Sequence, residues 1–144
     1  LVEDFIEFLE RHDMPIPDAL KGIASPSILI VDDEMPVAKS IQRVARRAGF
    51  DSYIATGGFQ AGIMLSQYEP KVMTLDLSMP GMDGYSVIEF TREQSKYKDL
   101  KIVVISALDD ISLERALEIG ADATLQKPFS NHDLTNVLEQ FMSM

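Results

Sequence analysis

From residue 27 onward, the chain alternates between short apolar runs and longer segments with helical periodicity. The apolar runs lie at residues 28–31, 53–55, 72–75, 102–105 and 123–125. Runs of this length, bounded by turn residues and separated by amphipathic segments, are typical of strands buried on both faces. Strands that alternate with helices form parallel sheets with right-handed crossovers. The pattern therefore predicts an α/β domain with a five-stranded parallel sheet.

Five helices are predicted between and after these strands. Their apolar residues recur at helical spacing, and glycine or proline marks several of their ends. The segments cover residues 37–48, 61–68, 85–96 and 113–120, and a fifth segment follows a cap at Ser130 or Asn131. Five β/α units of this length are typical of a doubly wound, flavodoxin-like sheet with strand order 2-1-3-4-5.

Residues 1–24 follow a different pattern. Their first apolar residues have the spacing of one amphipathic helix, which the prolines at 15 and 17 would end: Val2, Phe5, Ile6 and Leu9. This segment has six acidic and two basic residues, whereas the remainder has 17 and 11. We therefore expect an N-terminal helical extension over residues 1–24, or the tail of an upstream module, and a domain over residues 25–144.

Composition excludes several classes of function. The 144 residues are 46% hydrophobic and 25% charged, as expected for a folded domain. The chain has no cysteine, which excludes disulfides and thiolate chemistry. Its net charge of −10 argues against direct binding to nucleic acid. No apolar run approaches the length of a membrane helix and no signal peptide is visible, so a cytoplasmic protein without membrane contact is expected.

Aspartates follow two of the predicted strands. Asp32 and Asp33 come directly after the first apolar run, and Asp76 comes directly after the third. In open α/β sheets, ligands bind beyond the carboxyl ends of the strands. Several carboxylates gathered there repel one another unless a cation compensates them. The sequence therefore predicts a divalent metal site at this edge of the sheet.

Four motifs at strand ends connect these aspartates with other polar residues. They are Val31-Asp32-Asp33-Glu34, the segment 75–84 beginning Leu75-Asp76, Val104-Ile105-Ser106-Ala107 and Gln126-Lys127-Pro128-Phe129. In order and spacing they resemble the receiver (CheY-like) domain of two-component response regulators, over residues 26–142. The resemblance implies a phosphoacceptor signalling domain that catalyses its own phosphorylation and dephosphorylation and is not an enzyme with an external product.

The resemblance also implies a set of metal ligands and a phosphoacceptor. Asp76 would accept the phosphoryl group from a sensor histidine kinase or a phosphotransfer protein. Asp33, with Asp32, would hold Mg²⁺, and Asp76 and the backbone carbonyl of Ser78 would complete the protein ligands. Mg²⁺ keeps several waters, so this small number of oxygen ligands is sufficient.

A switch is implied as well. Lys127 would contact one phosphoryl oxygen and Ser106 another, which would pull the loop after the fourth strand inward. Thr124 stands at the switch position where the family usually has an aromatic residue. The surface for an output domain or partner protein would be the fourth helix, fifth strand and fifth helix, residues 109–142. The resemblance also implies that the Lys127–Pro128 peptide is often cis.

Two alternatives remain open. The chain could be a degenerate receiver that acts as an interaction module without phosphorylation, and Thr124 is the feature that favours this. It could also be a phosphatase of the haloacid dehalogenase type, which uses an aspartyl phosphate and Mg²⁺. Its nucleophile would lie at the first strand in an Asp-x-Asp pattern, whereas Asp32-Asp33-Glu34 occupies that place here.

Overall fold

The fold is a five-stranded parallel sheet with helices on both faces. The computed structural model describes Glu7, Arg11 and residues 25–142. Its strands are hydrogen-bonded in the order β2-β1-β3-β4-β5. Their bounds are β1 Ser27–Val31, β2 Asp51–Ala55, β3 Val72–Leu75, β4 Lys101–Ser106 and β5 Ala123–Gln126. The predicted α/β class, strand number and strand order are therefore confirmed.

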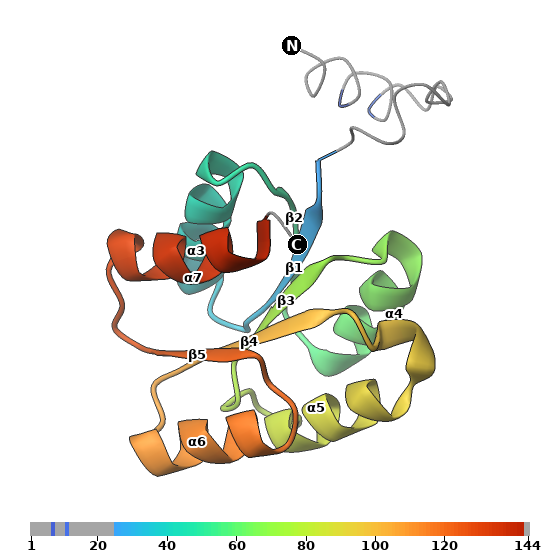
Figure 1. Cartoon of the computed structure of the whole chain (residues 1–144), viewed down its shortest axis with the longest axis vertical. Helices are drawn as coiled ribbons and strands as arrows, with labels where there is room; N and C mark the ends of the chain where they lie inside the picture. Colours follow the sequence, from blue (N-terminus) through green and yellow to red (C-terminus); the bar gives the residue numbers. More distant parts are fainter. Residues whose placement is uncertain (1–6, 8–10, 12–24, 143–144) are drawn as a thin grey trace.

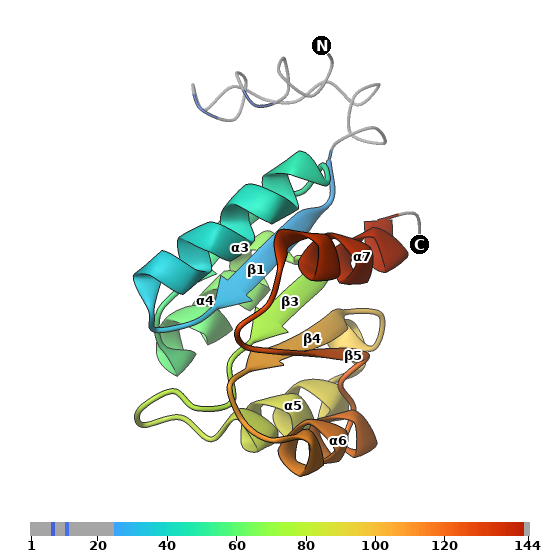
Figure 2. The same cartoon turned by 90° about the vertical axis from the view of Figure 1, so that its left-hand side faces the viewer.

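Five α-helices cover the sheet. Helices α3 and α7 lie on one face, and α4, α5 and α6 lie on the other (Figure 1, Figure 2). Their bounds are α3 Met35–Arg47, α4 Gly58–Tyr68, α5 Gly84–Glu93, α6 Asp110–Glu118 and α7 Asn131–Met142, and a 3-10 turn, η1 Ser95–Tyr97, follows α5.

Each strand contributes to two hydrophobic clusters because alternate side chains point to opposite faces. In β1, Ile28 and Ile30 pack with residues of α3 and α7. Leu29 and Val31 pack with residues of α4, α5 and α6. All four side chains are at most 1% exposed. This explains why the strands read as continuous apolar runs and not as alternating ones.

Local caps fix where several helices begin. The Asp83 carboxylate accepts a hydrogen bond from the Tyr85 N–H at the start of α5, and the Asp109 carboxylate accepts one from Ser112 at the start of α6. The Ser130 hydroxyl accepts a bond from the Asp133 N–H at the start of α7, which decides between the two predicted caps. The Ser86 hydroxyl also donates to Asp83, and this bond, together with that of Tyr85, lowers the pKa of Asp83. The bonds from Ser112 lower the pKa of Asp109.

The predicted end of the third helix was wrong. The pattern indicated a helix over residues 85–96, but α5 ends at Glu93 and Gln94 is extended. The Arg92 side chain explains the early end, because it donates to the carbonyls of Tyr97 and Leu100 just beyond the helix. It also donates to Gly120 and pairs with Asp122 at 2.6 Å. Charge-assisted bonds of this kind tie the start of β4 and the turn before β5 to α5.

The N-terminal prediction is largely untested. The proposed amphipathic helix and the boundary at residue 24 lie outside the described residues, apart from Glu7 and Arg11, which are helical and form an ion pair at 3.1 Å. Within the part of the chain that the structure describes, no helix has the length and apolarity that crossing a membrane requires.

Candidate functional site

The carboxyl ends of the adjacent strands meet at one edge of the sheet (Figure 2). Asp32 follows β1, Asp76 follows β3, Ser106 ends β4 and Lys127 follows β5. The register pairs Val31 with Leu75, so the two aspartates that follow lie side by side. Strands β3 and β4 separate β5 from β1, and the long side chain of Lys127 reaches Asp32, 95 positions earlier in the sequence. The strand-end residues therefore converge as the sequence predicted.

A short turn after each strand holds each buried aspartate. Asp32 is 1% exposed, and its Oδ1 accepts a hydrogen bond of 2.9 Å from the Glu34 N–H. Asp76 is 4% exposed, and its Oδ1 accepts one of 3.0 Å from the Ser78 N–H. Such bonds from the N–H two residues further on are a common property of aspartate in turns. They fix the two carboxylates in matching orientations and leave each Oδ2 for another partner.

Lys127 is that partner for both carboxylates. Its Nζ lies 2.8 Å from Asp32 Oδ2 and 3.1 Å from Asp76 Oδ2. Burial alone would lower the pKa of Lys127, but the hydrogen bonds and negative charges of the two aspartates outweigh burial and raise that pKa above its ordinary value. The lysine is therefore a fixed cation that compensates two buried anions.

Asp33 adds a third, exposed carboxylate to the group. Carboxylate oxygens of Asp32, Asp33 and Asp76 lie within 4.8 Å of one another. A set of oxygen donors with one exposed member suits a hard cation that keeps part of its water shell. The donor set therefore fits Mg²⁺. The N–H of Ser78 is engaged with Asp76, whereas the metal contact of its carbonyl stays a prediction.

Ser106 is fully buried beside this group. Its Oγ accepts a long hydrogen bond of 3.4 Å from the Leu108 N–H, and its carbonyl accepts one of 2.9 Å from the Lys127 N–H. The end of β4 is thus connected to the backbone of Lys127. The Lys127–Pro128 peptide is cis, in agreement with the resemblance.

Gln126 begins the fourth strand-end motif, but no role was predicted for its side chain from the sequence. Its side-chain amide donates a 2.8 Å hydrogen bond to the carbonyl of Leu108, in the loop between β4 and α6. The one available signal was a long polar side chain at the last position of a strand. Thr124, two positions earlier, is partly buried and pairs in register with Val104.

Comparison with known proteins agrees with this geometry. Residues 28–139 match the family described as the response regulator receiver domain. The chain belongs to this family. Receiver domains are signalling domains of two-component systems, so the resemblance drawn from the four strand-end motifs is confirmed.

Solved receiver domains are similar over most of this one. A receiver domain from Bermanella marisrubri is 44% identical, with a TM-score of 0.75, and the match covers 81% of this chain and 98% of that one. The receiver domain of a DNA-binding response regulator from Colwellia psychrerythraea 34H is 27% identical, with a TM-score of 0.78 and coverages of 83% and 99%. The chemotaxis protein CheY4 of Vibrio cholerae is 25% identical, with a TM-score of 0.75 and coverages of 82% and 99%.

Proposed function

We propose that Asp76 accepts a phosphoryl group from a histidine kinase or phosphotransfer protein in a step that requires Mg²⁺. The observation that carries this proposal is the shared contact of Lys127 with Asp32 and Asp76. Two buried carboxylates held around one lysine form a site with a nucleophile, a cation and a place for a second cation.

Asp76 supplies the nucleophile. One of its carboxylate oxygens forms a bond to phosphorus, and the bond from phosphorus to the donor's imidazole nitrogen breaks, with the electron pair staying on the imidazole. Asp32, Asp33, Asp76 and the carbonyl of Ser78 would hold Mg²⁺, which when bound offsets the repulsion between the anionic carboxylate and the anionic phosphoryl group. Lys127 is within reach of a phosphoryl oxygen on Asp76, because its Nζ already lies 3.1 Å from Asp76 Oδ2.

Ser106 would pass the phosphorylation state to the rest of the domain. Among the described residues its hydroxyl is held by a single long bond of 3.4 Å, so it can turn toward a phosphoryl oxygen. That turn releases the Leu108 N–H, and Gln126 connects the same loop to β5. Since Thr124 has no ring to move inward, we propose that the loop and Gln126 carry the change. The affected surface is α6, β5 and α7, where Ile111 and Leu117 of α6 are 77% and 42% exposed.

The direct test is the intact mass of the protein after incubation with acetyl phosphate. We expect a gain of one phosphoryl group that requires Mg²⁺ and is lost in Asp76→Asn. Asp83→Asn is the matched control, because it changes an exposed aspartate of the loop after β3 and keeps a side-chain oxygen for its cap. An unmodified mass in the presence of Mg²⁺ would instead favour a phosphorylation-independent interaction module.

A second test addresses the surface change. Amide hydrogen exchange, measured with and without a beryllofluoride mimic of the phosphoryl group, is expected to change in residues 107–126 more than in α3. Unchanged exchange across α6 and β5, with the mimic bound, would rule out the proposed switch.

A further inference from the structure

Helix α4 presents apolar side chains to solvent. Phe59 and Ile63, one helical turn apart, are 86% and 50% exposed, and we call them the α4 crest. None of the eleven residues of α4 is charged, whereas the outer face of α3 carries lysine and arginine. Large apolar side chains on the outer face of a helix are unusual unless another element covers them. The α4 crest therefore marks a surface that the described chain leaves uncovered.

An apolar groove lies beside the α4 crest, between α4 and α5. Its volume is about 470 Å³, and its walls include Gly62 of α4 and Phe90 of α5, above a floor formed by Met73. Phe90 is 65% exposed. A Cβ atom built on Gly62 would have no neighbour within 4 Å, so packing within the described residues does not require a glycine there. The glycine keeps the middle of the α4–α5 groove open.

The two ends of the α4–α5 groove carry opposite charges. Asp83 lines one end, at the start of α5, and Lys96 lines the other end, just beyond α5. Both side chains are exposed. The ten residues of α5 separate these charges by about 15 Å, from the rise of an α-helix. The surface is thus apolar in the middle, negative at one end and positive at the other.

We propose that a second copy of this chain covers the groove in a two-fold symmetric dimer. In a two-fold interface the same patch meets itself, so the patch must be complementary to itself. With α4 antiparallel to α4, Asp83 of one copy faces Lys96 of the other at both ends. The α4 crest of each copy then faces the groove of the other. The net charge of −10 makes two copies repel elsewhere, and this uncharged helix minimises that repulsion.

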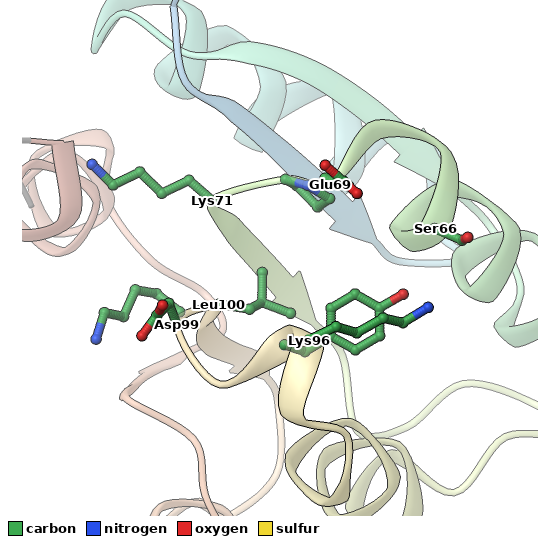
Figure 3. Close-up of a pocket in the computed structure, with 9 residues that line it drawn as sticks. Ser66, Glu69, Lys71, Lys96, Asp99 and Leu100 are labelled. Atoms are coloured by element: carbon green, nitrogen blue, oxygen red, sulfur yellow. The ribbon is translucent and has the colours of Figure 1, made fainter.

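A larger cavity, of about 630 Å³, lies at the opposite edge of the sheet and does not offer a comparable site. Three lysines line it, but Lys71 and Lys96 extend in opposite directions (Figure 3). Glu69 and Asp99 line the same cavity. Its positive charges therefore do not converge on a bound anion.

Sedimentation velocity across micromolar to submillimolar concentrations tests the dimer in unphosphorylated protein, so the result is independent of the proposed phosphotransfer. We expect the wild-type chain to associate, and Phe59→Glu and Ile63→Glu to remain monomeric. Met35→Glu is the matched control, because Met35 is 41% exposed on α3, on the opposite face of the sheet from the groove. A wild-type chain that is monomeric throughout, or a dimer that persists in both α4 variants, would overturn the proposal.

Charge and cross-linking tests identify the face. We expect Lys96→Glu to weaken association several-fold. Lys98→Glu changes an exposed neighbour that does not line the groove and should leave association unchanged.

Because the chain has no cysteine, Gly62→Cys and Gln140→Cys each introduce one thiol. A short bismaleimide should link two copies through position 62 and not through position 140 on α7. Efficient linking through position 140 alone would assign the dimer to another face.

Discussion

The site at the carboxyl edge and the surface of α4 depart in opposite ways from the usual distribution of side chains. At the site, charged groups are buried: Asp32 and Asp76 are at most 4% exposed. On α4, an apolar group is exposed: Phe59 is 86% accessible. Buried charges and exposed aromatic residues are the informative exceptions in a folded protein. The two regions therefore have different requirements. The buried carboxylates of the site require positive charge beside them, and the exposed apolar side chains of α4 require a surface that covers them.

The largest expected effect comes from removing the compensating charge. Lys127→Met leaves two buried carboxylates without their cation, and we expect it to cost roughly 3 kcal/mol of unfolding free energy in the absence of Mg²⁺. Added Mg²⁺ should restore part of this loss by binding to the same carboxylates. Urea denaturation with and without Mg²⁺ measures both the loss of unfolding free energy and its partial recovery. The exposed Lys98→Met should change stability by less than about 0.5 kcal/mol, and equal effects of the two variants would contradict the assigned role of Lys127.

The same ion pairs predict a loss of stability at alkaline pH. The pKa of Lys127 is raised in the folded protein above its ordinary value of 10.5. The folded state therefore holds this proton more tightly than the unfolded state does. The resulting stabilisation is fully present below pH 10.5 and is lost as the pH rises through the higher folded-state value. Denaturation at a series of alkaline pH values should show this loss in the wild type and a smaller one in Lys127→Met.

A third prediction compares buried polar groups with and without partners. Thr74 in β3 is 1% exposed, and its hydroxyl has no hydrogen-bond partner among the described residues. Thr74→Val should therefore raise the unfolding free energy by about 1 kcal/mol, because an unsatisfied hydroxyl is replaced by a methyl group of similar shape. Thr91 is equally buried, but its hydroxyl donates to Val87 at 2.7 Å. Thermal melts should show a higher melting temperature for Thr74→Val than for the wild type, and no increase for Thr91→Val.

The smallest expected effect concerns the open groove. Gly62→Ala should stabilise the monomer by about 0.5–1 kcal/mol, because alanine reduces the entropy lost on helix formation. The added Cβ has free space, whereas a Cβ on Gly84 would lie 2.8 Å from the backbone of Leu77. Gly84→Ala should therefore lower the melting temperature at dilute concentrations where Gly62→Ala raises it. A destabilising Gly62→Ala would show that another group fills the groove.

Much of the fold could be predicted because it depends on patterns that many residues share. Apolar runs such as residues 28–31 indicate strands buried on both faces, and the helical segments between them require parallel pairing. Topology then places Asp32, Asp76 and Lys127 at the same edge, since the carboxyl ends of parallel strands share it, and the family resemblance assigned Lys127 its role there. No knowledge of side-chain packing was needed for either inference.

The remaining features depend on single side chains reaching distant groups. Arg92 ends α5 early through bonds to residues beyond it, and Gln126 reaches the carbonyl of Leu108 across 18 positions. Periodicity carries no information on which carbonyl a long polar side chain will find. The predicted helix over residues 61–68 also began too late to include Phe59, and only the packed structure shows that this side chain is exposed.

The strand order has a consequence for how the chain is made. Among the five described strands, β1 is synthesised first and lies between β2 and β3. Every later strand of the sheet is added at an existing edge: β2 and β3 beside β1, β4 beside β3, and β5 beside β4. No strand has to insert between two that are already paired. The sheet can therefore grow outward in the order of synthesis, and α7, which is made after all five of these strands, covers a face whose strands are already in place.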